Sequence, residues 1–392
     1  NRLTISQLSI SCLIAILSVG SCRQAGGDPL PGALSIDEYI NLIRGKKIAV
    51  VANQTSMAGQ VHLVDFLIGR GIRPQAIFAP EHGFRDLADA GEKIEDGRDP
   101  STGIMLISLY GSHLKPTPED LKGIDIVIFD IQDVGARFYT YISTLHYVLE
   151  ACAENNVRCL VLDRPNPNGF YFDGNVADTS HRTFVSMDPV PIVHGMTVGE
   201  YAMMLNGEGW LKNGIRCDLK VIPCKNYTHK TLYELPVRPS PNLPNQTSVY
   251  LYPSICFFEG TNLSLGRGTD FPFQVYGSPH LPDKGFSFTP RSLPGAKNPP
   301  LLGVKCYGVD LRNAIADGIV PVPQINLEWI ISAYRDFPEK DKFFTEYFDV
   351  LASGPALRQQ IQAGMSAEMI RATWQDDLVR FGKIREKYLL YD

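Results

Sequence analysis

The sequence predicts an α/β protein: a Rossmann-like, doubly wound and mostly parallel sheet, followed by a second, smaller α+β domain. Between about residues 36 and 225, short and nearly continuous apolar strands alternate with helical stretches. Strands of this kind are buried on both faces, as parallel strands covered by helices are. After about residue 225, proline-rich turns and short strands replace the alternation, and the tail from 357 to 391 is helical again. We therefore expect a Rossmann-like domain at 36–225 and a smaller domain at 226–392 that closes a cleft.

The elements of the first domain follow from its apolar runs. The expected strands are 47–52, 75–79, 104–109, 124–130 and 158–163, and the expected helices are 61–71 and 144–155. Thr197 and Glu200 are three residues apart at the start of an apolar run, which predicts a capping box and a structural role for both. The glycine fingerprint of dinucleotide sites is absent after the first strand, so we expect no dinucleotide cofactor.

The N-terminal segment is typical of a targeting sequence. The apolar run from 8 to 19 is too short to cross a membrane comfortably and fits the core of a signal peptide. Val19-Gly20-Ser21-Cys22 resembles a bacterial lipobox. We expect a lipoprotein signal peptide at 1–22, a tether at 23–35, a lipid on Cys22, and a periplasmic or cell-envelope address. An ordinary signal peptide followed by a chance cysteine is the alternative.

Composition and cysteine spacing exclude several classes of protein. Of 392 residues, 44% are hydrophobic and 20% charged, which excludes a disordered chain. The net charge is −5 and no long basic tract is present, so we expect no nucleic-acid partner. The cysteines do not have zinc-site spacing, and we expect no metal. Buried thiols are the preferred interpretation of Cys152 and Cys159.

Polar clusters follow four of the five predicted strands. Because the carboxyl ends of parallel strands meet at one edge, where open α/β sheets bind ligands, these clusters should converge on one cleft. They comprise Asn53 after the first strand; Glu81, His82, Arg85 and Glu92 after the second; Asp130, Gln132, Asp133, Arg137, Tyr139 and Tyr141 after the fourth; and Asp163, Arg164 and Asn166 after the fifth. Further candidates are His194, Asn242, Glu259, Asn262, Arg267 and Thr269.

The residue types in this cleft favour glycoside cleavage. Neither the Gly-x-Ser-x-Gly elbow of α/β-hydrolases nor the His-Glu-x-x-His of zincins occurs. Carboxylates remain, with amides, arginines and tyrosines around them. Glycosidases use one carboxylic acid to protonate the leaving oxygen and a second group to activate water, attack, or stabilise an oxocarbenium ion.

Five segments carry a family resemblance: 78–85, 129–141, 162–167, 239–244 and 258–269. With them the chain resembles the bacterial exo-β-N-acetylmuramidases of the NamZ type, over about 36 to 392. The resemblance implies a Rossmann-like domain, a smaller C-terminal domain and a cleft between them. It also implies release of N-acetylmuramic acid from the non-reducing end of peptidoglycan fragments, without a metal or organic cofactor. The expected partners are muramic-acid glycosides, and the membrane only through the lipid.

Roles can be assigned as hypotheses. Glu81 is the candidate general acid, because walls formed by Phe78 and Phe84 would raise the pKa of its carboxyl group. Glu92 is the second carboxylate candidate, and His82 and Asp130 complete the catalytic set. The other residues named above are candidates for binding the sugar. Substrate assistance by the acetamido group is an alternative to an enzyme nucleophile.

Particular binding roles are also expected. Arg267, Arg137 or Arg164 would bind the lactyl carboxylate of muramic acid. Asn242 and Asn262 would bind its acetamido group. Asp163 and Arg164 can instead form a structural ion pair.

Two rival functions remain open. A periplasmic amino-sugar-binding lipoprotein would use the same cleft without turnover. A metal-dependent phosphoesterase would use Asp130, Asp133, Asp163 and His82.

Overall fold

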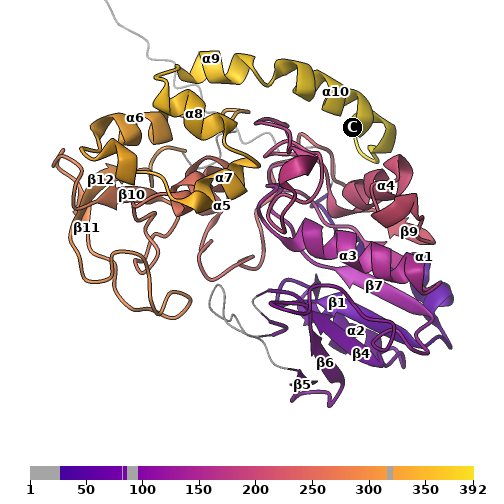
Figure 1. Cartoon of the computed structure of the whole chain (residues 1–392). Coiled ribbons are helices and arrows are strands. Elements are labelled where there is room, and N and C mark those ends of the chain that lie inside the picture. Colours follow the sequence, from indigo (N-terminus) through magenta and orange to yellow (C-terminus); the bar gives the residue numbers. More distant parts are fainter. Residues whose placement is uncertain (1–26, 82, 86–95, 316–320) are drawn as a thin grey trace, which may run out of the picture.

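The computed structural model describes residues 27–81, 83–85, 96–315 and 321–392 (Figure 1). The proposed leader with Cys22, and the candidates His82 and Glu92, lie outside the described residues. Within them, no helix is both long and apolar enough to cross a membrane.

A seven-stranded sheet forms the first domain, in the order β5-β6-β4-β1-β7-β8-β9. Its strands are β1 (Ile48–Ala52), β4 (Ala76–Ala79), β5 (Gly97–Arg98), β6 (Met105–Ser108), β7 (Ile126–Asp130), β8 (Arg158–Leu162) and β9 (Leu219–Ile222). Only the short edge strand β5 is antiparallel to its neighbour. The chain builds β1, β4 and β6 outward on one side, then β7, β8 and β9 on the other. The predicted doubly wound, mostly parallel sheet is confirmed.

Helices cover both faces of this sheet (Figure 1). Alternate residues of the strands belong to two separate cores. Val50 and Ile128 pack on the side of α1 (Ile36–Ile43) and α2 (Leu63–Ile68). Val51 and Phe129 pack on the side of α3 (Tyr141–Glu154) and α4 (Val198–Glu208), in a core that continues into the second domain.

The structure differs from the predicted elements in several places, and α1 and β5 are among the elements that were not predicted. The helix expected over 61–71 covers only 63–68, because β3 (Val61–His62) pairs with β2 (Met57–Ala58) as a hairpin before α2 begins. The helix expected from 144 begins three residues earlier, at Tyr141. Strand β9 was not predicted; its residues have only a short, mixed apolar pattern, and pairing with β8 defines it.

The second domain surrounds a small antiparallel sheet in the order β10-β12-β11. Its elements are α5 (Gln246–Ile255), β10 (Val275–Ser278), β11 (Ser287–Phe288), β12 (Cys306–Asp310), α6 (Glu328–Asp336), α7 (Glu346–Ala352), α8 (Ala356–Gln362), α9 (Ala367–Ala372) and α10 (Gln375–Arg385). The short 3-10 helix η4 (Cys256–Gly260) directly follows α5. This arrangement agrees with the expected smaller α+β domain and helical tail.

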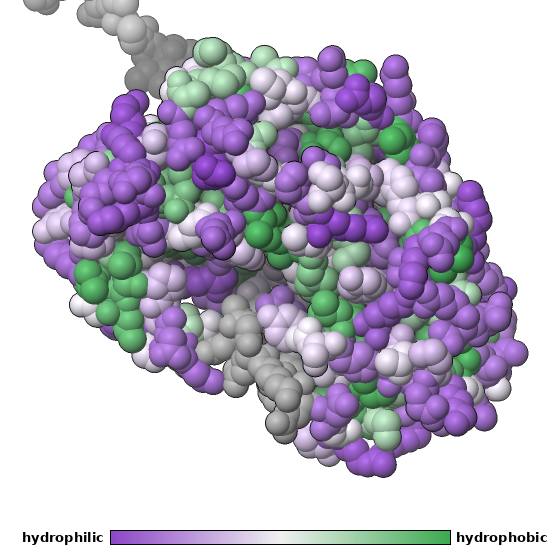
Figure 2. Space-filling view, viewed as in Figure 1, coloured by the Kyte–Doolittle hydropathy of each residue, from purple (hydrophilic) through white to green (hydrophobic). Residues whose placement is uncertain are grey.

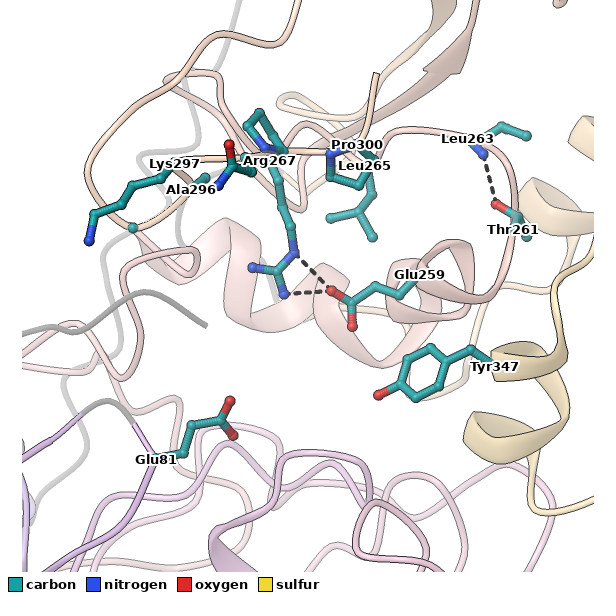
Figure 3. A pocket seen from close by; sticks show the side chains of 13 residues that line it. Glu81, Glu259, Thr261, Leu263, Leu265, Arg267, Ala296, Lys297, Pro300 and Tyr347 are labelled. Carbon is teal, nitrogen blue, oxygen red and sulfur yellow. Dashed lines mark hydrogen bonds and ion pairs between the residues drawn. The ribbon is translucent and has the colours of Figure 1, made fainter. Parts of the chain in front are cut away.

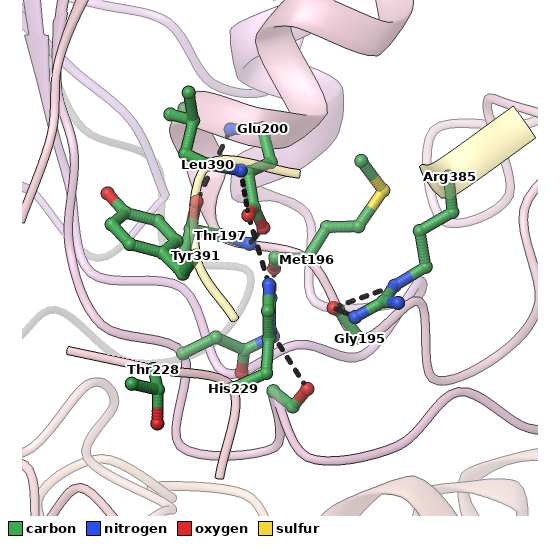
Figure 4. Close-up of polar contacts among 12 residues, drawn as sticks. Gly195, Met196, Thr197, Glu200, Thr228, His229, Arg385, Leu390 and Tyr391 are labelled. Carbon is green, nitrogen blue, oxygen red and sulfur yellow. Dashed lines mark hydrogen bonds and ion pairs between the residues drawn. The ribbon is translucent and has the colours of Figure 1, made fainter. Parts of the chain in front are cut away.

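The C-terminal tail returns to the first domain and binds beside α4 (Figure 4). The Leu390 amide donates to Glu200 Oε1 over 2.8 Å, and the Tyr391 hydroxyl donates to Asp163 Oδ2 over 2.6 Å. Glu200 and Thr197 form the expected capping box at the start of α4. The tail therefore connects the second domain to the first next to the carboxyl end of β8.

Candidate active site

Two cavities meet in the hollow between the domains, on the face that Figure 2 shows. The wider has a volume of about 670 Å³ and the narrower about 190 Å³. Glu81, Glu259, Arg267 and Tyr347 line both, so the two cavities are parts of one site. Two carboxylates contributed by different domains are therefore exposed to the same space.

Glu81 lies at the carboxyl edge of the sheet, just beyond β4. Its Oε1 accepts from the Tyr110 hydroxyl and its Oε2 from the Thr140 hydroxyl, each over 3.1 Å. The Tyr141 hydroxyl donates to the Glu81 carbonyl over 3.4 Å. Two neutral hydroxyl donors thus orient this carboxyl group.

Glu259 faces Glu81 from the other domain, as Figure 3 shows. It lies on η4, and Nε of Arg267 donates to its Oε1 over 2.8 Å. Burial alone would lower the pKa of Arg267, but the adjacent Glu259 carboxylate outweighs it and raises the pKa above its usual value. Glu259 is therefore paired with a guanidinium group, whereas Glu81 is not bound to a cation among the described residues.

Local backbone geometry places the Glu259–Arg267 pair. Arg267 lies between Gly266 and Gly268, whose φ angles of 86° and 79° favour glycine. A Cβ on Gly268 would lie 2.4 Å from a backbone oxygen, so a side chain does not fit there. A Cβ on Gly260 would lie 2.3 Å from Cα of Phe348, so η4 and α7 can pack closely only with glycine at this position. This packing brings Tyr347 of α7 into the site.

Aromatic side chains surround the narrower cavity. Tyr139 and Tyr141 line it, together with Tyr110, Phe138, Tyr252 and Phe273. The rings of Tyr139 and Tyr141 are 4.9 Å apart in an edge-to-face arrangement. Burial raises the pKa of both tyrosines, so their hydroxyl groups are neutral donors at physiological pH. Rings and neutral hydroxyls suit the apolar face and polar edge of a sugar ring.

Below the cavities lies a layer of buried polar residues. Asp130 and Arg164 form an ion pair with Nε–Oδ1 and Nη2–Oδ2 distances of 2.6 and 2.9 Å, and both are essentially inaccessible to solvent. Asp163 accepts from Thr197, from the Gly199 amide and from Tyr391, instead of pairing with Arg164 as one interpretation expected. Desolvation raises the pKa of Asp163 to about 6. Because Asp130 is buried in its ion pair with Arg164, its surroundings do not support the expected catalytic role.

Several other residues that were predicted to bind substrate form bonds within the protein and do not line either cavity. Arg137 donates to the carbonyls of Asn175, Val190 and Leu351, and Arg85 pairs with Asp65 and Asp99. Six more of these residues form side-chain hydrogen bonds with backbone groups of loops or turns: Asn53, Gln132, Asn166, Asn242, Asn262 and Thr269. Asp133 accepts from the Gly135 amide and lies 3.6 Å from His194, whose Nδ1 accepts from the Met196 amide. Of the three arginines expected to bind a carboxylate, only Arg267 reaches the site.

Sequence reasoning missed three residues that shape the site: Tyr110, Thr140 and Tyr347. Tyr110 follows the 104–109 strand, the one strand that was given no polar cluster, and Thr140 lies between two tyrosines that were named. Tyr347 is on a helix some 80 residues beyond Arg267, and no local pattern marks it.

No group of three or more His, Cys, Asp or Glu residues in the described ranges is placed to hold a metal ion. The six described cysteines, Cys152 and Cys159 among them, are buried free thiols.

Two family models match the chain almost end to end. Residues 48–247 match "Exo-beta-N-acetylmuramidase NamZ, N-terminal", and residues 250–391 match the corresponding C-terminal description. The two matches meet close to residue 250, beyond the predicted division at 225, which stays a prediction. The peptidoglycan beta-N-acetylmuramidase NamZ of Bacillus subtilis (strain 168) is 38% identical over 377 residues, covering 91% of this chain and 89% of the relative.

Two crystal structures share the fold, both of DUF1343 family proteins from Bacteroides fragilis. The first has a TM-score of 0.86 at 48% identity, and the second a TM-score of 0.78 at 28% identity. Each comparison covers 93% of this chain and 99% of the other. The likeness therefore extends over both domains and the cleft between them.

Proposed function

The chain belongs to the exo-β-N-acetylmuramidase NamZ family, and from that premise we propose that it releases N-acetylmuramic acid from the non-reducing end of peptidoglycan fragments. One observation supports this reaction most directly: two carboxylates from different domains line one site in which a narrow aromatic cavity adjoins a wide one. A terminal sugar fits the narrow cavity, and the leaving strand extends through the wide one. The binding-protein and phosphoesterase alternatives have no comparable support.

Glu81 is the general acid of the proposed mechanism. Its carboxyl group, oriented by Tyr110 and Thr140, gives its proton to the glycosidic oxygen as the bond to the anomeric carbon breaks. Glu259, which is held in place by Arg267, is the second carboxylate and stabilises the positive charge that develops on the sugar ring. Water then adds to the anomeric carbon, either directly or after Glu92 or the substrate's own acetamido oxygen has formed an intermediate there, and its proton returns to the Glu81 carboxylate.

Arg267 also explains how muramic acid can be distinguished from N-acetylglucosamine. Only muramic acid carries a lactyl carboxylate, and the guanidinium group of Arg267 lines both cavities. Its Nε and Nη2 atoms bind Glu259, so Nη1 is the atom that can donate to the lactyl group. A charge-assisted bond of this kind gives selectivity for the acidic sugar.

Hydrolysis of a chromogenic β-N-acetylmuramide, beside the matching β-N-acetylglucosaminide and with EDTA present, tests the proposal. We expect release from the muramide only, and a loss of about 10²- to 10⁴-fold in kcat/KM for Glu81→Gln. Glu92→Gln tests the second carboxylate, and Glu119→Gln on the exposed surface is the matched control. Full activity of Glu81→Gln would transfer the acid role to Glu92. Binding of muramic acid without any turnover would favour the binding-protein alternative.

We further propose that the protein is held in the cell envelope by a lipid on Cys22. The apolar run from 8 to 19 and the lipobox-like Val19-Gly20-Ser21-Cys22 support this location. Metabolic labelling with an alkyne fatty acid in a bacterial host should label the wild type and not Cys22→Ser. Equal labelling of both would reject the anchor while leaving the enzymatic proposal intact.

A further inference from the structure

A third cavity, of about 380 Å³, lies on the second domain next to the wide cavity. Thr261, Leu263 and Pro300 line both cavities, so the two are in contact. In Figure 3, Thr261 and Leu263 lie on the side of the wide cavity that is farther from Glu81. The narrow, wide and third cavities therefore follow one another away from the catalytic carboxyl group.

The wall between the wide and third cavities is held rigidly. Asn262 lies between Thr261 and Leu263, and its amide donates to the Phe343 carbonyl over 3.0 Å. Its side-chain Nδ2 donates to the Lys342 carbonyl over 2.5 Å. Thr261 also forms an isolated antiparallel bridge with Phe344. Asn262, expected to bind an acetamido group in the catalytic site, thus shapes the third cavity.

The lining of the third cavity suits a sugar residue. Leu263, Leu301 and Phe337 give it an apolar floor, and the Phe337 ring packs edge-to-face against His280 at 5.8 Å. Besides Thr261 and Asn262, the polar residues on its lining are His280, Glu339 and Lys342, of which the last two form an ion pair. An apolar floor with a few polar groups at its edge matches the ring faces and hydroxyl edges of a carbohydrate.

We infer that the third cavity binds the second sugar beyond the scissile bond, on the leaving strand of the peptidoglycan fragment. The inference rests on the proposed function, which places the terminal sugar in the narrow cavity and the first leaving sugar in the wide one. The enzyme then prefers longer strands over a disaccharide. Contacts made there add binding energy that the shortest substrate cannot supply.

The test compares kcat/KM for two peptide-free substrates with muramic acid at the non-reducing end, a disaccharide and a tetrasaccharide. We expect the wild type to favour the tetrasaccharide by about tenfold, which corresponds to about 1.4 kcal/mol. The double substitution His280→Ala and Lys342→Ala should bring this ratio close to one. Both side chains are at the surface, so thermal unfolding should remain near that of the wild type.

The matched control is the double substitution Lys284→Ala and Arg335→Ala. These residues line a separate cavity of about 240 Å³ that has no lining residue in common with the wide or third cavity. This variant should keep the tetrasaccharide preference. A wild-type ratio near one, or an unchanged ratio in the His280/Lys342 variant, would overturn the inference while the muramidase function stands. No hydrolysis of either substrate would overturn the proposed function itself.

Discussion

Glu81 lies just beyond β4 and Asp130 ends β7, the two strands that flank β1, yet the surroundings of these two carboxylates are opposite. Glu81 lines both cavities and accepts hydrogen bonds from hydroxyl groups. Asp130 is fully buried and held by the guanidinium group of Arg164. The same sheet edge therefore carries one carboxylate positioned for chemistry and another that supports the loops around it. Substitutions in the two regions should separate activity from stability.

The largest effect on stability should come from Asp130→Asn. This change leaves the buried Arg164 guanidinium without its counter-charge, and breaking a buried pair costs about 3–5 kcal/mol. The free energy of unfolding in urea measures it. Asp218→Asn is the matched control, because its ion pair with Arg158 is exposed and should contribute less than about 1 kcal/mol. Equal losses in the two variants would contradict a supporting role for the Asp130 pair.

His146 on α3 should make the buried region sensitive to alkaline pH. Burial would lower the pKa of His146, but Asp188 and Glu150, at 2.9 and 3.0 Å, raise it to about 9. Because this folded-state pKa exceeds the unfolded value of 6.5, the stabilisation is complete below pH 6.5 and disappears as pH rises through 9. The size of the effect is up to about 3 kcal/mol.

Urea unfolding of the wild type and of His146→Gln at pH 6.5 and pH 10 checks this dependence. The difference between the two proteins should be largest at pH 6.5 and should shrink at pH 10. A difference that stays constant with pH would show that the protonated imidazole contributes nothing. Activity is not the readout here, since His146 does not line either cavity.

Glu259→Gln should act on catalysis, in contrast to the two changes above. Loss of the negative charge of Glu259 removes stabilisation of the positive charge that develops on the sugar ring. We therefore expect kcat to fall about 10- to 100-fold, which corresponds to a rise of about 1.4–2.7 kcal/mol in the activation free energy. The thermal unfolding midpoint should fall less than in Asp130→Asn, because the side chain of Glu259 is 21% exposed whereas that of Asp130 is fully buried. Arg267→Lys, which keeps a positive charge but loses the planar fork, should instead raise KM for the muramide. A normal kcat in Glu259→Gln would remove Glu259 from the mechanism.

The contrast between Glu81 and Asp130 also shows how far the sequence could be interpreted. Apolar runs predicted the five central strands correctly, because a buried parallel strand leaves an unbroken local pattern. Of the polar residues that were predicted after these strands and that the structure describes, only Glu81, Tyr139 and Tyr141 line the cavities, and residue type alone does not reveal which of them face solvent. Arg137 and Arg267 are both arginines near glycine, and only tertiary packing directs the first to backbone carbonyls and the second to the cavity.

Tyr347 illustrates the remaining limit. It reaches the site because η4 and α7 pack closely at Gly260, a contact between segments almost 90 residues apart. The hydrophobic periodicity of the sequence does not predict a contact between such distant segments. The family resemblance supplied the activity and the two-domain layout, whereas the pairing of Glu259 with Arg267 and their position opposite Glu81 required the structure.

The smallest effect should come from Tyr391→Phe at the C-terminal end of the buried region. Its hydroxyl donates to Asp163 over 2.6 Å, and loss of this bond should cost about 1 kcal/mol. Desolvation raises the pKa of Asp163 to about 6, so folding takes up a proton between about pH 4 and 6 and stability falls as pH rises through that window. Because a hydrogen bond to the ionised carboxylate is the stronger one, Tyr391→Phe should cost more at pH 7.5 than at pH 4.5.

Tyr388→Phe provides the control for this pH dependence, again measured by urea unfolding. The Tyr388 hydroxyl donates to Glu208 over 2.7 Å, and this bond, with that from Lys387, lowers the pKa of Glu208 below its ordinary value. Because the pKa of Glu208 lies below its ordinary value of 4.5, the cost of Tyr388→Phe should fall mainly below pH 4.5 and should change less between pH 4.5 and 7.5 than the cost of Tyr391→Phe. If Tyr391→Phe is equally insensitive to pH, Asp163 titrates normally, and burial at the sheet edge does not distinguish it from exposed carboxylates. A cost that grows with pH only for Tyr391→Phe would confirm that the C-terminal tail stabilises the buried charge of Asp163.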